Sequence, residues 1–174
     1  MSQTIKAGYR IMSPNLTDYD SLYHSFNWQN EAVNLEGLPA NKGLNIAYEA
    51  VDRWAKGDDA QRIALRWIRK DRSYQDYTFS GLQQLSARFA NILTTLGIVK
   101  GDRVFSLTGR IPELYIAALG TLKTTAVFCP LFSVFGPEPV FQRLSRGDAK
   151  VLITTSALFE KKIKPLMERL PALR

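Results

Sequence analysis

Beyond residue 97, the pattern of hydrophobic and polar positions changes repeatedly between the period of a strand and that of a helix. Short apolar runs predict strands at 104–107, 126–131 and 151–153. Longer patterns that open on proline or serine predict helices from Pro112 to 124, from Pro137, and from Ser156 to 170. The last two predicted strands are continuously apolar, so we expect them to be buried on both faces. This alternation predicts an α/β fold with helices packed on a mostly parallel sheet.

A hairpin and a long helix are predicted just before this region. Apolar and more polar residues alternate over 63–67, which is typical of a half-buried strand, and 77–79 predicts the returning strand. From 82 to 96, apolar side chains recur at helical spacing, and a glycine follows as the expected stop. Ser80 and Gln83 fit a capping box at the start of this helix.

The beginning of the chain has a different character. Residues 1–43 show no sustained periodicity, and we expect them to form a strap that lies on the rest of the protein. Within it, Thr17 predicts the cap of a short helix, whereas Asn45 is expected to cap a helix running through Ala55. The predicted organisation is therefore a strap segment at 1–43 followed by an α/β domain at 44–174.

Composition excludes several classes of protein. The 174 residues are 45% hydrophobic and 22% charged, unlike a disordered or fibrous chain. A single cysteine, Cys129, excludes an intrachain disulfide framework, and a single histidine, His24, excludes a histidine-rich metal site. The longest apolar run, 126–132, is shorter than the ~20 residues that span a bilayer. No secretion signal is recognisable, so we expect a soluble, cytoplasmic protein without a membrane partner.

The charge balance is basic. Lysine and arginine number 23 against 16 acidic residues, a net charge of +7. This favours polyanionic partners such as phosphorylated cofactors, nucleic acid or a membrane surface, without choosing among them. The basic residues at 62–72 surround Trp67 and Tyr74. This composition can bind single-stranded nucleic acid through phosphate contacts and stacking. We favour a solvated hairpin there, and do not expect nucleic acid as a partner.

The residues taken alone show no catalytic set. The sequence contains neither the glycine-rich dinucleotide fingerprint nor a complete phosphate loop. The stretch 120–124 resembles such a loop only superficially, because it lies within a helical stripe. Cys129 is expected to behave as a small hydrophobe in a buried strand. The neighbouring acids Asp58 and Asp59 fit a turn better than a pair of acid–base carboxylates.

Several short stretches carry a combined pattern from about Tyr19 to Thr155. They lie at 19–28, 44–53, 77–80, 87–91, 96–104, 111–113, 135–138 with Arg143, and 149–154. In order and spacing they resemble the N-terminal part of acetyl-CoA synthetases, in the adenylate-forming superfamily that includes luciferases and peptide-synthetase adenylation domains. The Asn-Ile-Ala-Tyr…Asp-Arg element at 45–53 points to the acetate-type branch.

The resemblance implies a two-step ligase reaction. A small carboxylate such as acetate attacks ATP to give an acyl adenylate and pyrophosphate, assisted by Mg²⁺, and the thiolate of coenzyme A (CoA) then displaces AMP. The family's phosphate loop, adenine-binding motifs and catalytic lysine have no counterpart before Arg174. We therefore expect 44–174 to be the first part of the large N-terminal domain. No catalytic residue is expected in it, the ATP and Mg²⁺ sites should lie in the rest of the enzyme, and the chain should be inactive alone.

The resemblance also implies one binding site within the chain. In acetyl-CoA synthetases, a Phe-Gly-Gly-Phe loop lies beside CoA. The aligned residues here are Phe132, Ser133, Val134 and Phe135. Val134 stands where the family has glycine, although a shorter bacterial branch has Pro-Leu-Phe-x-x-Phe. Family arginines near the CoA nucleotide correspond to Lys161 and Lys162, which supply charge without the bidentate fork of arginine.

Two other interpretations stay open at this point. The chain could be a stand-alone module that binds CoA, a nucleotide or nucleic acid. It could instead belong to another adenylating enzyme, such as a peptide-synthetase adenylation domain. The sequence does not indicate acyl chain length or oligomeric state.

Overall fold

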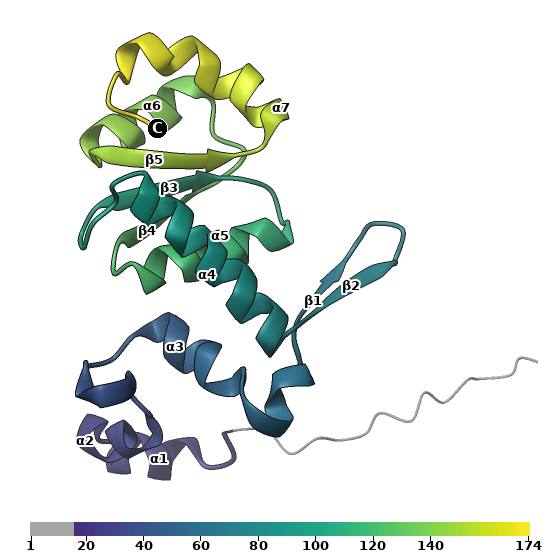
Figure 1. Ribbon diagram of the computed structural model, residues 1–174, viewed down its shortest axis with the longest axis vertical. Helices are drawn as coiled ribbons and strands as arrows, with labels where there is room; N and C mark the ends of the chain where they lie inside the picture. The colour runs from purple at the N-terminus through teal and green to yellow at the C-terminus, as the bar shows by residue number, and fades with distance from the viewer. Residues whose placement is uncertain (1–15) are drawn as a thin grey trace, which may run out of the picture. The chain divides into compact units, whose positions relative to one another are not determined.

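The computed structural model describes residues 16–174, which form two compact units divided after Leu35. The first unit contains two short α-helices and one 3-10 turn: α1 (Tyr19–Ser25), α2 (Trp28–Glu31) and η1 (Ala32–Asn34). The short helix predicted near Thr17 is confirmed, but its cap is Asp18, whose side chain accepts a hydrogen bond from the Ser21 N–H at 3.0 Å. The second unit, residues 36–174, contains every strand described (Figure 1).

The second unit opens with short helical turns joined by irregular backbone. These are η2 (Pro39–Asn41), α3 (Ile46–Ala50), η3 (Asp52–Trp54) and η4 (Gly57–Gln61). Asn45 caps α3 as predicted, accepting hydrogen bonds from the N–H groups of Ala47 and Tyr48. The predicted continuation to Ala55 is wrong, because the backbone leaves helical geometry at Val51. The Trp54 indole donates to the Glu49 carbonyl at 3.1 Å, taking an acceptor that a continued helix would use.

The predicted hairpin and long helix are both present. Strands β1 (Ile63–Ile68) and β2 (Tyr74–Thr78) pair antiparallel, and helix α4 (Phe79–Thr95) follows directly. The cap of α4 is Thr78, whose hydroxyl accepts the Gly81 N–H at 3.1 Å. The predicted capping box at Ser80 and Gln83 is therefore wrong by two residues, since the helix has already begun at Phe79.

The central sheet confirms the α/β prediction. Strands β3 (Arg103–Leu107), β4 (Val127–Leu131) and β5 (Ala149–Thr154) are parallel, in the spatial order β4-β3-β5. Helix α5 (Pro112–Lys123) connects β3 to β4, and α6 (Pro137–Arg146) connects β4 to β5. Both helices begin with proline at the first position, where no amide donor is needed.

The two faces of β3 belong to two apolar clusters. Val104 packs with Leu93 of α4 and with Ile98 on one face. On the other face, Leu107 packs with Val140 and other buried residues of the α6 side. Figure 1 shows α4 and α5 on one side of the sheet and α6 and α7 on the other. The sheet is thus a middle layer between helices, as expected for a parallel sheet.

The expectation that β4 is buried on both faces is wrong. Val127 is 47% exposed and Pro130 is also exposed. In the described part of the chain, β4 pairs only with β3 and so forms an edge of the sheet. Proline is tolerated there because an edge strand leaves one row of amides without ladder partners. The apolar run predicted a strand correctly, but it did not reveal how many neighbours that strand has.

The last predicted helix is irregular. One turn of α-helix, α7 (Ser156–Leu158), leads into a π-helical turn, η5 (Phe159–Ile163), and then a 3-10 segment, η6 (Lys164–Arg169). Thr155 caps α7 in place of Ser156, with the Leu158 N–H 3.4 Å from its hydroxyl. Pro165 lies in the first turn of η6, where its missing amide hydrogen is tolerated. Further on, Arg174 pairs with β5 through hydrogen bonds to Lys150 and Leu152.

Candidate functional site

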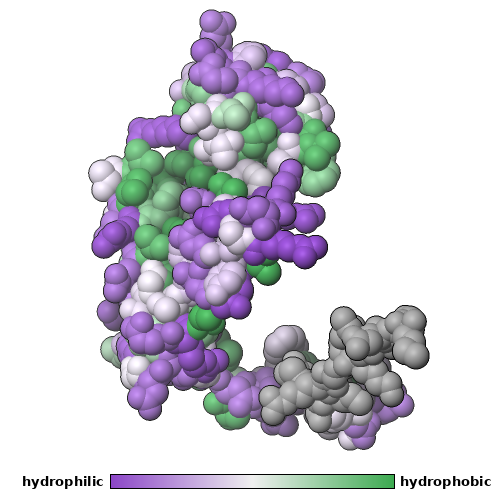
Figure 2. All heavy atoms as spheres, turned by 90° about the vertical axis from the view of Figure 1, so that its right-hand side faces the viewer, coloured by the Kyte–Doolittle hydropathy of each residue, from purple (hydrophilic) through white to green (hydrophobic). Residues whose placement is uncertain are grey.

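The carboxyl end of the β4-β3-β5 sheet has the topology of a ligand site. The connection after β3 leads to α5 on one face, and the connection after β5 leads to α7 on the other (Figure 1). In open parallel sheets, ligands bind where successive connections part in this way. Figure 2 looks onto this end of the sheet, and hydrophobic surface is visible beside the hydrophilic projection of the hairpin.

The connection after β4 forms a tight turn at this end. The Phe135 N–H donates to the Phe132 carbonyl at 3.0 Å, and the two phenyl rings meet edge to face with centroids 5.8 Å apart. The side chains at the tip point outward: Phe132 is 64% exposed and Val134 is 72% exposed. We call residues 132–135 the apolar turn. It presents apolar surface to solvent although its backbone is held in a defined shape.

Lys162 lies beneath the apolar turn. Its residue is only 9% exposed, and its Nζ donates to the carbonyl oxygens of Ser133 and Phe135, each at 2.6 Å. The structure therefore joins two of the predicted site regions, 29 residues apart in sequence, through one side chain. Its neighbour Lys161 is exposed. The two lysines thus differ in orientation, and only Lys161 offers its charge directly to solvent.

A shallow hollow adjoins the apolar turn along α6. Its volume is about 570 Å³, and its walls include Phe135, Leu131, Gln142, Arg143 and Arg146. The Arg143 guanidinium stacks on the Phe135 ring, 4.2 Å from its centroid, and also donates to the Pro139 carbonyl at 2.9 Å. Such stacking fixes the ring while leaving positive charge at the edge of the hollow. This contact could not be predicted from the sequence spacing, because Phe135 lies in the turn and Arg143 lies eight residues later in helix α6.

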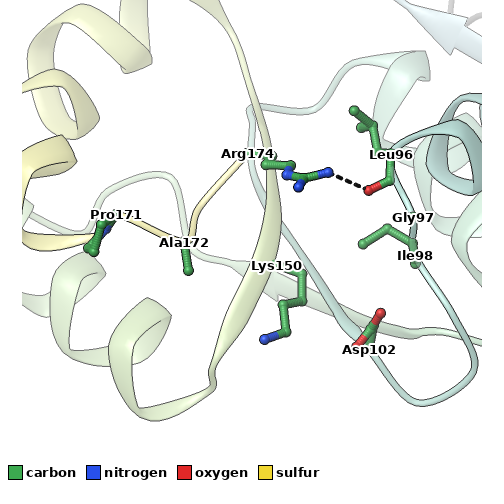
Figure 3. A pocket seen from close by; sticks show the side chains of 8 residues that line it. All are labelled: Leu96, Gly97, Ile98, Asp102, Lys150, Pro171, Ala172 and Arg174. Carbon is green, nitrogen blue, oxygen red and sulfur yellow. Dashed lines mark hydrogen bonds between the residues drawn. The ribbon is translucent and has the colours of Figure 1, made fainter.

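A second hollow lies at the opposite, amino end of the strands. Its volume is about 450 Å³, and Figure 3 shows Lys150 and Arg174 along its wall with Asp102 across from them. The Arg174 guanidinium donates to the Leu96 carbonyl at 2.7 Å. The Nζ of Lys150 lies 3.2 Å from Asp148, so its charge is already paired. None of the residues predicted to bind a cofactor lines this hollow.

The described residues hold few groups suited to direct catalysis. No three His, Cys, Asp or Glu side chains among residues 16–174 are placed to hold a metal ion. Burial raises the pKa of the Cys129 thiol, opposing the thiolate form that a nucleophile needs. The hydroxyls of Ser106 and Thr108 are buried without a hydrogen-bond partner in this structure. These side chains lie on and just after β3, between the two flanking strands.

The basic hairpin satisfies much of its charge internally. Arg66 makes two hydrogen bonds to Asp76, at 2.6 and 2.7 Å, and stacks on Tyr74 at 4.3 Å. Arg69 stacks on Trp67 at 4.5 Å. The aromatic faces that could take up bases are thus paired with arginines of the same hairpin. Between residues 16 and 174, no helix has the length and apolar character needed to cross a membrane.

Comparison with known proteins relates this geometry to a family. The AMP-binding enzyme family matches residues 51–174. Acetyl-coenzyme A synthetase from Bacillus subtilis is 39% identical over 148 residues, which are 84% of this chain and 26% of the relative. The enzyme of the same name from Methanothrix soehngenii is 34% identical over 120 residues, 68% of this chain and 18% of the relative. The chain thus spans about a quarter or less of the length of these relatives.

Solved structures agree with the sequence matches. The crystal structure of Brucella canis acyl-CoA synthetase superposes with a TM-score of 0.73 at 36% identity, covering 82% of this chain and 26% of that one. The anthranilate CoA ligase AuaEII, solved with anthranoyl-AMP, gives a TM-score of 0.65 at 25% identity over 75% of this chain and 24% of that one. The resemblance to adenylate-forming enzymes is therefore confirmed: this chain belongs to the AMP-binding enzyme family, and its fold matches about a quarter of an acyl-CoA synthetase.

Proposed function

We propose that these 174 residues serve as the first part of an AMP-forming synthetase that joins acetate or another short carboxylate to CoA. The family match over residues 51–174, together with 39% identity to an acetyl-coenzyme A synthetase, carries this proposal. In the proposed reaction, a carboxylate oxygen attacks the α-phosphorus of ATP and pyrophosphate leaves. The CoA thiolate then attacks the acyl carbonyl, and AMP leaves.

The proposed contribution of this chain is to receive CoA at the apolar turn. Phe132 and Val134 offer exposed apolar surface that fits the pantetheine arm, and Ser133 completes the turn. Lys161 is exposed and cationic, so it suits a phosphate of the CoA nucleotide. Val134 adds a side chain where related loops carry glycine, so the arm would pass beside this side chain, not directly over the backbone.

The same proposal places ATP and Mg²⁺ outside this chain. The sequence lacks a phosphate loop, and residues 16–174 hold no trio of metal-ligating side chains. When bound, Mg²⁺ would neutralise phosphate charge during adenylate formation. The 174-residue chain alone is therefore expected to be inactive, and it would act with the remainder of a synthetase.

Activity measurements test this assignment. We expect purified 1–174 to show no ATP–pyrophosphate exchange, whereas the complete synthetase that carries these residues exchanges pyrophosphate with acetate and forms acetyl-CoA. Exchange by 1–174 alone would contradict the division of sites. A complete protein that forms no acyl-CoA from any short carboxylate would contradict the function itself.

The nucleotide contact can be tested separately. Replacing Lys161 with Ala in the complete synthetase should raise the KM for CoA by about tenfold, the effect of losing one charge-assisted hydrogen bond. The KM for ATP should stay the same. An unchanged KM for CoA would remove Lys161 from the site.

A further inference from the structure

Lys162 is an unusual lysine because its charge is buried under a turn. The residue is 9% exposed, and the two hydrogen bonds donated by its ammonium end on neutral main-chain carbonyls, those of Ser133 and Phe135. Burying an ammonium costs free energy unless its protons are taken up by acceptors. Two short hydrogen bonds from a charged donor are among the stronger polar contacts in a protein. They hold this turn more firmly than its own single backbone hydrogen bond could.

The backbone that carries Lys162 is itself fixed. Lys162 lies in the π-helical turn η5, a helix type that is rare and is frequent at functional sites. The next residue, Ile163, is 1% exposed and packs in the core cluster with Leu107 and Leu166. The lysine therefore extends from a backbone anchored in the core, and its ammonium has little freedom to move.

The two contacts have a definite effect on the apolar turn. They draw the carbonyls at 133 and 135 toward η5, while the side chains of Phe132 and Val134 stay exposed. The Phe135 ring is held from its other side by the Arg143 guanidinium. The turn is thus fixed in one shape before any ligand arrives, which lowers the entropic cost of binding.

We infer that Lys162 is a positioning residue for CoA: its buried ammonium fixes the apolar turn 132–135 in the shape that receives the pantetheine arm, and it does not itself contact the nucleotide. This inference rests on the proposed function. It assigns the two adjacent lysines to different tasks, Lys161 to the ligand and Lys162 to the turn.

The first test concerns the contact alone and needs no activity. In the 174-residue chain with ¹⁵N-labelled lysine, the Lys162 ammonium protons should exchange with water at least about tenfold more slowly than those of Lys164, because hydrogen-bonded groups must open before they exchange. Lys164 is the matched reference, since its side chain is 62% exposed and paired only with Glu160 on the surface. Equal exchange rates for the two lysines would overturn the inference.

The second test concerns function and uses the complete synthetase. Lys162→Met keeps the length of the side chain but removes its donors, and Lys164→Met is the control. We expect Lys162→Met to raise the KM for CoA by about tenfold or more, since hydrogen bonds to a charged group contribute at least that factor. ATP–pyrophosphate exchange, which precedes CoA binding, should change less than about twofold. Lys162→Arg retains hydrogen-bond donors, so its KM for CoA should lie between that of the wild type and that of Lys162→Met.

The outcomes separate the two proposals. An unchanged KM for CoA in Lys162→Met, or an equal loss in pyrophosphate exchange, would show that Lys162 has no specific positioning role. If Lys162→Met does not fold, as judged by its thermal midpoint, Lys162→Arg and the ammonium exchange rates still decide. If the wild-type synthetase makes no acyl-CoA, the proposed function fails, whereas slow ammonium exchange would still show that Lys162 holds the turn.

Discussion

Two regions of the second unit are stabilised in different ways. In residues 36–61, Glu49 accepts hydrogen bonds from the N–H groups of Gly37 and Glu36, at 2.7 and 3.2 Å, and from Arg53 at 2.6 Å. In the β4-β3-β5 sheet, by contrast, Val104 and Leu107 are fully buried among apolar side chains. Residues 36–61 add charged groups with polar partners to a few buried apolar side chains such as Ala47 and Val51, whereas the sheet depends mainly on apolar area removed from water.

The difference follows from what each segment has available. Residues 36–61 form only short helical turns, whose ends leave many backbone amides and carbonyls to be satisfied by side chains. The strands satisfy their backbone through ladder hydrogen bonds, so their side chains are free to pack. The sheet should therefore respond to changes in side-chain volume, and residues 36–61 should respond to changes in charge and pH.

The largest effect is expected from Leu107→Ala in β3. Leu107 is 0% exposed and lies in the cluster between the sheet and α6. Removing a buried leucine side chain typically costs about 2–5 kcal/mol, because transfer energy is lost and a cavity is left. Urea unfolding of the 174-residue chain should show this loss, with Val99→Ala, an exposed position, as the control. A loss of less than about 1 kcal/mol would mean that this core is loosely packed.

A smaller loss is expected when volume is added between α4 and α5. A Cβ at Gly120 would lie 2.7 Å from the Phe89 ring and 2.8 Å from the Ser86 carbonyl. The backbone contact cannot move aside cheaply, so Gly120→Ala should destabilise the chain by about 1–3 kcal/mol despite the better helix propensity of alanine. Gly109→Ala is the matched control, because nothing lies within 4 Å of a Cβ there. Equal stability of the two variants would disprove the close packing of these helices.

The ion pair between Asp52 and Lys123 tests the polar region. Their side chains are 19% and 13% exposed, the atoms are 2.7 Å apart, and Lys123 also donates to the Gln83 carbonyl. Asp52→Ala should cost about 1–3 kcal/mol, below the value for a fully buried pair because water still reaches both groups. Adding Lys123→Met should restore part of the loss. Strict additivity of the two changes in a double-mutant cycle would show that the pair is not coupled.

The smallest expected effect is the pH dependence of the stability that Glu49 contributes. Desolvation by itself raises the pKa of Glu49, but hydrogen bonds from Arg53 and from the Gly37 and Glu36 amides outweigh it and hold the pKa below its usual value. A lowered pKa in the folded state stabilises the protein above the unfolded pKa of about 4.3, and this stabilisation is lost as pH falls through the folded value.

We therefore expect the stability difference between wild type and Glu49→Gln to be largest near neutral pH and to shrink on acidification below about pH 4. Unfolding curves recorded from pH 7 to pH 3 measure this difference. A gap that stays constant over the range would show that the carboxylate contributes nothing through its charge. The sheet variant Leu107→Ala should show such a constant gap, which makes it the reference for this comparison.

The candidate site shows how far the sequence alone could lead. The pattern predicted a strand at 126–131 and a helix from Pro137, and the resemblance directed attention to residues 132–135 between them and to the two lysines. The resemblance implies the same role for Lys161 and Lys162, a contact with the CoA nucleotide. In the structure, Lys162 turns toward the carbonyls at 133 and 135 while Lys161 stays exposed, because the π-helical turn η5 sets the direction of each side chain. A regular helix was expected there, so this direction could not be predicted.

Local chemistry determined the elements of this protein. The Asn45 side chain accepts hydrogen bonds from the first amides of a helix, and the prolines at 112 and 137 suit the first position of a helix. The apolar runs favour burial in strands. The order of strands and helices could therefore be predicted from the sequence. Tertiary structure decided what depends on contacts across long separations. These include the edge position of β4, the Asp52–Lys123 pair and the contact of Lys162 with the apolar turn. The physical reason is that propensity and periodicity report on neighbours within a few residues, whereas a buried charge finds its partners only when the whole chain has folded.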